Sequence, residues 1–201
     1  SKKIRLDIFN TLNYKEKNID GVIDFVLINK ENSFNYKISQ NSLEFVSTNK
    51  NFDGSVDFKP FYFRSNLNFN YLNLKKLFQN NSILINLINS GILNNQNLNG
   101  NLNINFKKLD NNYLDNLKLK SYLDEGNYII KDLSFNWNKA ATINVNDIQI
   151  ISELNDIKFM GQITFNFDDL EKFYSYYQVK RSQRQKLKKV KLDFIYELNK
   201  E

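Results

Sequence analysis

The chain has 201 residues, of which 41% are apolar and 14% aromatic, and it carries a net charge of +6 with no His and no Cys. This length and composition are typical of one folded domain rather than of a disordered chain. Without His or Cys, the sequence excludes Cys/His zinc sites, Ser-His-Asp triads and disulfide scaffolds. It also has no run of about 18 apolar residues, so it predicts no membrane-spanning helix.

Apolar and polar residues alternate with a period of two along most of the chain, which predicts half-buried β-strands. Clusters of turn-forming residues separate these runs at a spacing typical of an antiparallel meander. We expect a mainly β fold built on one long, curved antiparallel sheet. The predicted strands lie around residues 4–8, 19–27, 34–38, 43–45, 56–58, 67–71, 98–106, 117–119, 128–130, 133–137, 143–145, 148–150, 159–167 and 190–198.

Two segments change to a helical period and predict two short helices. The first lies near residues 73–90 and is followed by Gly91 as a C-terminal cap. The second lies near residues 168–179, where Asp168 and Glu171 match the spacing of a capping box. Both follow a strand directly, so we expect them to lie across an apolar face of the sheet.

Four of the six glycines share the pattern apolar-x-Gly-x-apolar-x-apolar, as in "IDGVIDF" at 19–25. Parity places these sheet-bending candidates, Gly21, Gly54, Gly100 and Gly161, on the apolar faces of their strands. Such a gap admits a neighbouring ring, a backbone or a ligand, or permits a bulge that bends the strand. Alternatively, they are ordinary turn or bulge glycines. The flanking candidates for an apolar groove are Ile19, Ile23, Phe25, Phe52, Val56, Phe58, Leu98, Leu102, Ile104, Phe159, Ile163 and Phe165.

No constellation of residues indicates catalysis. The adjacent carboxylates Asp124 and Glu125 would point to opposite faces of a strand, and no phosphate-binding glycine loop with G-x-G spacing occurs. We therefore expect a protein that is not an enzyme and that holds no cofactor or metal.

Residues 180–191 contain seven basic residues and no acidic one. This run is either a solvated face, a site for anionic lipid headgroups, or a weaker candidate for nucleic-acid binding. The aromatic residues precede the basic run instead of interleaving with it, so no nucleic-acid partner is expected. The headgroup candidates are Lys180, Arg181, Arg184, Lys186, Lys188 and Lys189.

Four tracts resemble the C-terminal region of AsmA-like proteins of the bacterial envelope. They are "FDGSVDFKPFYFRSNLNFNYLNLKKLF" (52–78), "LNGNLNINFKKL" (98–109), "LDEGNYIIKDLSFNW" (123–137) and "FMGQITFNFDDLEKFYSYYQV" (159–179). The resemblance implies a periplasmic, taco-shaped β-groove that carries phospholipid between the inner and outer membranes. It also implies an inner-membrane anchor in a segment outside this chain.

We expect residues 1–201 to form one β-rich domain that is a fragment of a longer periplasmic protein. Its expected function is to bind or conduct phospholipid acyl chains, with inner and outer membrane and other envelope proteins as partners. The alternatives are a structural or interaction module for outer-membrane protein assembly and, more weakly, a nucleic-acid-binding β domain. The sequence does not decide between an open groove and a closed sandwich.

Overall fold

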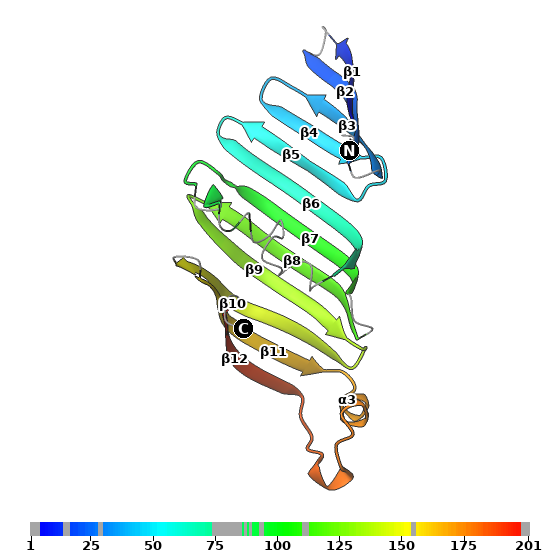
Figure 1. The fold of residues 1–201 in the computed structure, drawn as a ribbon, viewed down its shortest axis with the longest axis vertical. Coiled ribbons are helices and arrows are strands. Elements are labelled where there is room, and N and C mark those ends of the chain that lie inside the picture. The colour runs from blue at the N-terminus through cyan, green and yellow to red at the C-terminus, as the bar shows by residue number, and fades with distance from the viewer. Residues whose placement is uncertain are drawn as a thin grey trace.

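In the computed structural model, one open sheet contains twelve strands in chain order (Figure 1). The structure describes residues 5–13, 17–27, 30–73, 86, 88, 90–92, 95–109, 113–153 and 156–197. The mainly β prediction is confirmed, and the sheet is open rather than closed into a sandwich. The strands are β1 (Arg5–Asn13), β2 (Asn18–Leu27), β3 (Lys30–Ile38), β4 (Ser42–Ser47), β5 (Phe52–Phe58), β6 (Phe61–Leu72), β7 (Gly100–Leu109), β8 (Leu114–Asp124), β9 (Asn127–Trp137), β10 (Ala141–Glu153), β11 (Asp156–Phe167) and β12 (Lys189–Glu197).

The sheet is mixed, which corrects the prediction of an entirely antiparallel sheet. Ten of its eleven strand pairs are antiparallel, whereas β6 and β7 run parallel. Short turns can return the chain only in the antiparallel sense, but a parallel pair needs a connection of about a dozen residues or more. Residues 73–99 supply that length between β6 and β7.

Strands β9 and β10 are each continuous where the alternation pattern predicts two separate strands. In β10 the pairing register with β11 shifts between Asn146 and Gln149, and Asp147 there has a φ of 55°. A β-bulge adds one residue to a strand, so the positions that point to the apolar face change from odd to even, or the reverse, while the strand continues. The apolar positions Val145 and Ile148 therefore differ in parity but belong to one strand. The apparent break in β9 has the same cause. Lys120 and Ser121 of β8 are opposite Asp132 and Ile130, so Lys131 is an extra residue in β9.

The sequence predicts two helices, and one of them, α3 (Leu170–Tyr176), lies wholly within the described residues. The other predicted helix, near residues 73–90, lies almost wholly outside the described residues. The predicted cap of α3 is wrong by one position: Asp169 is the N-cap, and its carboxylate accepts a hydrogen bond from the Lys172 backbone N–H at 2.9 Å. Glu171 binds Arg184 rather than completing a capping box.

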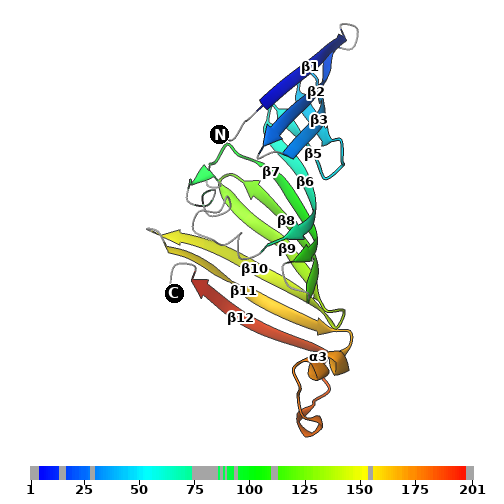
Figure 2. The same ribbon diagram turned by 45° about the vertical axis from the view of Figure 1, so that its right-hand side comes forward.

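A cluster of buried apolar residues lies where β9 and β10 meet α3 (Figure 2). Trp137, Ala140 and Ile143 are buried there, and the ring of Phe173 from α3 contacts the Trp137 ring edge-on at 5.1 Å. Helix α3 therefore covers one corner of the sheet, through Phe173 on Trp137 and Phe167. Within the described part of the chain, no helix has the length and apolar character needed to cross a membrane.

The observed cap can be tested by removing each of the two adjacent carboxylates. We expect Asp169→Ala to lower the free energy of unfolding by about 1 kcal/mol, because the Lys172 N–H loses its acceptor. Asp168→Ala is the matched control, since the Asp168 carboxylate accepts only a long contact of 3.4 Å from Thr142 Oγ1, and the backbone hydrogen bond to the Ala140 carbonyl survives the change. Urea unfolding of both variants measures the difference. Equal losses, or a larger loss for Asp168→Ala, would mean that the cap is misassigned.

Candidate apolar binding face

The pairing register aligns apolar residues from strand to strand on one face of the sheet. Residues directly opposite one another in neighbouring strands point to the same face. Starting at Phe52 in β5 and moving to the directly opposite residue in each next strand as far as β12, every residue reached is apolar. These eight residues, which we call the apolar row, are Phe52, Leu67, Ile104, Leu119, Leu133, Val145, Ile163 and Leu192.

The apolar row also continues toward β1. Ile8, Ile23 and Phe34 are directly opposite one another in β1, β2 and β3. Strand β4 places the buried Ser47 at this level, and the rings of Phe34 and Phe52 meet edge-on at 5.3 Å. With strands about 4.8 Å apart, the eleven steps of a twelve-stranded sheet give the apolar face a length of about 53 Å.

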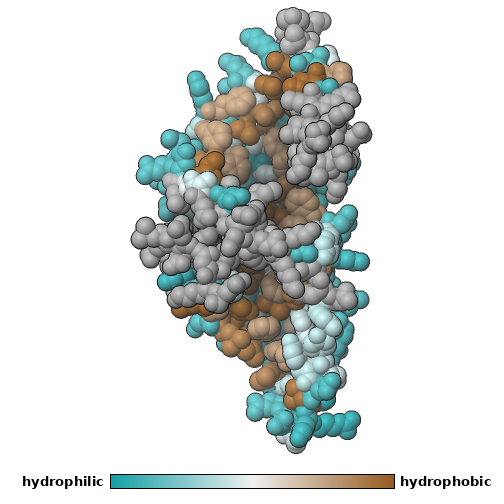
Figure 3. All heavy atoms as spheres, in the orientation of Figure 1, coloured by the Kyte–Doolittle hydropathy of each residue, from teal (hydrophilic) through white to brown (hydrophobic). Residues whose placement is uncertain are grey.

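Much of this face is not covered by other described elements. Each described strand makes extensive contacts only with its sheet neighbours. The chain exposes 14791 Å², whereas a compact monomer of the same 23.9 kDa mass exposes about 9,900 Å². Hydrophobic surface is visible over the upper and lower strands in Figure 3, bordered by hydrophilic residues. Ile88, in the β6–β7 connection, is buried, and α3 covers the corner at Trp137.

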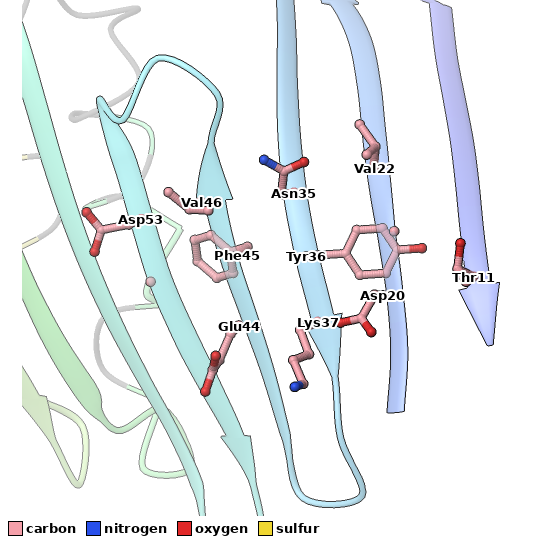
Figure 4. A pocket seen from close by; sticks show the side chains of 12 residues that line it. Thr11, Asp20, Val22, Asn35, Tyr36, Lys37, Glu44, Phe45, Val46 and Asp53 are labelled. Atoms are coloured by element: carbon pink, nitrogen blue, oxygen red, sulfur yellow. The ribbon is translucent and has the colours of Figure 1, made fainter. Parts of the chain in front are cut away.

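Each repeated glycine lies directly opposite an aromatic residue of a neighbouring strand. The pairs are Gly21 with Tyr36, Gly54 with Phe45, Gly100 with Phe63, and Gly161 with Phe194. A Cβ on Gly21 would lie 2.5 Å from Cζ of Tyr36, and one on Gly54 would lie 2.6 Å from Cζ of Phe45. Figure 4 shows the Tyr36 ring reaching from β3 across β2. The gaps in the apolar face are therefore filled by rings of the protein itself.

The structure places the sequence candidates on the same face but on separate strands. Ile19 and Ile23 lie in β2, Phe52, Val56 and Phe58 in β5, Leu102 and Ile104 in β7, and Phe159, Ile163 and Phe165 in β11. Phe25 also lies in β2, although its side chain is outside the described part. Leu98 precedes β7, which begins at Gly100 rather than at Leu98 as the alternation predicts.

The candidate set omitted the strands that lie between these four. Residues such as Leu67, Leu119 and Leu133 complete the apolar row, but no glycine motif marks them. Their alternation with polar residues indicates an apolar face. Only the register shows that all these faces are continuous.

A shallow hollow of about 640 Å³ lies over β1 to β5 (Figure 4). Its lining includes Asp20, Lys37 and Glu44, which are directly opposite one another in β2, β3 and β4. With Asp53 of β5, the lining carries three carboxylates and one lysine, so the hollow does not suit an anionic headgroup. Among the described residues, no group of carboxylates is arranged to hold a metal ion.

The headgroup candidates are not equivalent. Arg184 donates hydrogen bonds to the Val179 carbonyl and to the Glu171 carboxylate, so it holds the local structure. The other five, Lys180, Arg181, Lys186, Lys188 and Lys189, are exposed.

Comparison of the chain with protein-family models, curated proteins and solved structures found no match.

The glycine–aromatic pairs predict a specific sensitivity to a single added methyl group. We expect Gly54→Ala to lower the free energy of unfolding by about 1–3 kcal/mol, because the new Cβ would collide with the Arg64 carbonyl and the Phe45 ring. Ser55→Ala, at the adjacent position on the opposite face, is the control. Chemical denaturation provides the measurement. No loss of stability in Gly54→Ala would show that the ring is not held against the backbone.

A buried phenol on the apolar face predicts a pH dependence of stability. Burial raises the pKa of Tyr128, although its hydrogen bond with Ser121, at 3.0 Å, opposes the shift. The folded chain therefore keeps this proton to higher pH than the unfolded chain. The corresponding stability is present below pH about 10 and is lost as pH rises above it.

We expect this alkaline loss of unfolding free energy to be smaller in Tyr128→Phe than in the unchanged chain. Urea unfolding at neutral pH and near pH 11 measures it. Tyr122→Phe, on the opposite face of β8, is the control. Identical losses in all three proteins would contradict the assignment to Tyr128.

Proposed function

We propose that the chain is a non-enzymatic β module that binds phospholipid acyl chains along its apolar face and conducts them between the inner and outer membranes. The observation that carries this proposal is the apolar row together with its continuation through Phe34, Ile23 and Ile8 to β1. Over β1 to β6, no described element of the chain packs on this face as a second layer. Apolar surface of this extent on a soluble domain normally marks a binding region.

Lipid tails match this face in both chemistry and size. Burial of apolar surface contributes about 0.8 kcal/mol for each methylene removed from water. One acyl chain reaches across about half of a bilayer core, or about 15 Å. A face of about 53 Å can therefore accommodate several tails in succession, which is what conduction along the long axis requires.

The proposal includes the curved, taco-like groove, the periplasmic location and the membrane anchor outside this chain, all of which the AsmA-like resemblance implies. Its support is the chain's sheet architecture together with the quoted sequence tracts. In this arrangement the acyl chains are the direct ligand, and the two membranes are the donor and acceptor.

A structural or protein-interaction module for outer-membrane protein assembly is the second candidate, favoured by the outer edge of β12. Leu192 and Tyr196 are exposed on one face of this edge strand and Ile195 on the other. An edge strand with apolar side chains on both faces can pair with a strand of another protein. This function would use the edge rather than the apolar face.

The lipid proposal can be tested by making two apolar-face residues polar. Phe58 and Phe61 are directly opposite one another and are 41% and 42% exposed. We expect the double variant Phe58→Asn with Phe61→Asn to bind a fluorescent fatty-acid probe about tenfold more weakly. Covering a whole Phe side chain contributes about 1.5–3 kcal/mol, so covering the exposed two-fifths of each ring contributes about 0.6–1.3 kcal/mol, and about 1.4 kcal/mol in total is tenfold in affinity. Probe titration and mass spectrometry of co-purified lipid provide the readouts.

The matched control changes two residues of similar exposure on the opposite face, Val46→Asn with Ile129→Asn. This variant should bind the probe as well as the unchanged chain. Equal weakening in both double variants, or the absence of co-purified lipid and of probe binding in the unchanged chain, would contradict the proposal.

A further inference from the structure

One end of the molecule carries most of its net charge. Residues 168–191, which we call the tip, include α3, the 3₁₀ turn η2 (Arg181–Gln183) and the start of β12. They contain eight basic and three acidic residues, a net charge of +5 out of +6 for the whole chain. Figures 1 and 2 both show α3 and the loop after it projecting beyond the last strands along the long axis.

The loop of the tip is held in a defined conformation. The Tyr174 hydroxyl donates a hydrogen bond to the Gln185 carbonyl and accepts one from the Gln185 N–H at 3.0 Å. The Arg184 guanidinium lies 5.8 Å from the centre of the Tyr174 ring and pairs with Glu171. These contacts join the loop to α3, so the five exposed headgroup candidates are presented together at a fixed place.

Two of the three acidic residues are occupied within the tip. Asp169 caps α3, and Glu171 pairs with Arg184. None of the five exposed headgroup candidates forms an ion pair within the described residues of the chain. The tip therefore presents a strongly positive surface.

Exposed tyrosine and leucine residues lie beside these cations. Tyr176 and Tyr177 end α3 three to four residues before Lys180, and Leu187 lies between Lys186 and Lys188; all three side chains are exposed. Tyr113 lies edge-on to Tyr176, with ring centres 4.8 Å apart. Their hydrogen bond raises the pKa of Tyr176 to about 12, so the phenol stays neutral. Tyrosine is enriched where protein meets the interfacial layer of a bilayer.

We propose that the tip docks on the surface of an anionic bilayer. Lysine and arginine side chains contact the headgroups, while Tyr177 and Leu187 enter the interfacial layer. The sheet then stands with its long axis away from the membrane. This inference goes beyond acyl-chain binding and does not require it.

The arrangement of the rings favours lipid over single-stranded nucleic acid. Bases bind by stacking on exposed aromatic faces. Tyr177 of the tip stacks on Trp137 of β9 with an interplanar angle of 11°, and Tyr176 meets both of these rings edge-on. The exposed rings therefore do not form a row of parallel faces on which successive bases could stack.

Vesicle co-sedimentation of the whole chain tests the proposal. We expect binding to vesicles of phosphatidylcholine with 30% phosphatidylglycerol and none to pure phosphatidylcholine. The triple variant Lys180→Gln, Arg181→Gln and Lys186→Gln should bind about 100-fold more weakly, because each cation near an anionic surface contributes about fivefold. Leu187→Ser should weaken binding without changing its dependence on salt.

The matched control neutralises three exposed lysines on the sheet: Lys107→Gln, Lys118→Gln and Lys131→Gln. Equal weakening by the two triple variants, or equal binding to both vesicle types, would overturn the proposal. So would a 20-nucleotide DNA strand that displaces the chain from the vesicles. Fatty-acid probe binding without vesicles should be unchanged in the tip variants, so failure of docking and failure of acyl-chain binding are distinguishable.

Discussion

The register of backbone hydrogen bonding across the sheet is the constraint on which the other features depend. A shift of one residue in any strand would exchange its two faces. Because every step from β5 to β12 joins apolar residues, all of these strands turn the same face in the same direction. One continuous apolar surface results, although no strand contributes more than a few residues to it.

A β-bulge in β10 and side-chain hydrogen bonds between β6 and β7 keep the apolar residues aligned at two irregular places in the sheet. The bulge at Asp147 restores the apolar parity of β10, and Gly161 lies beside it in β11. At the parallel junction, Asn103 and Asn105 donate side-chain hydrogen bonds to Asn66 and Asn68, both at 2.9 Å. These bonds connect β6 and β7 on the opposite face, where no tight turn fixes their alignment.

The strands could be predicted from the sequence because alternation is a local property, and the shared face of Gly21, Ile19 and Ile23 follows from parity alone. The occupant of the gap at Gly21 could not be predicted. Tyr36 fills it from the next strand, and only non-local pairing determines which residue lies opposite. The parallel pair and the use of Asp169 rather than Asp168 as the cap likewise depend on how distant segments meet.

Photo-crosslinking to phospholipid would show which face of the sheet the lipid contacts. A photoreactive amino acid would replace Leu192 on the apolar face or Ile195 on the opposite face of β12, where both side chains are exposed. Phe58 and Val46 would form a second such pair. The account predicts lipid adducts at Leu192 and Phe58 and none at Ile195 and Val46. Adducts of equal yield on both faces, or adducts confined to Ile195 and Val46, would contradict it.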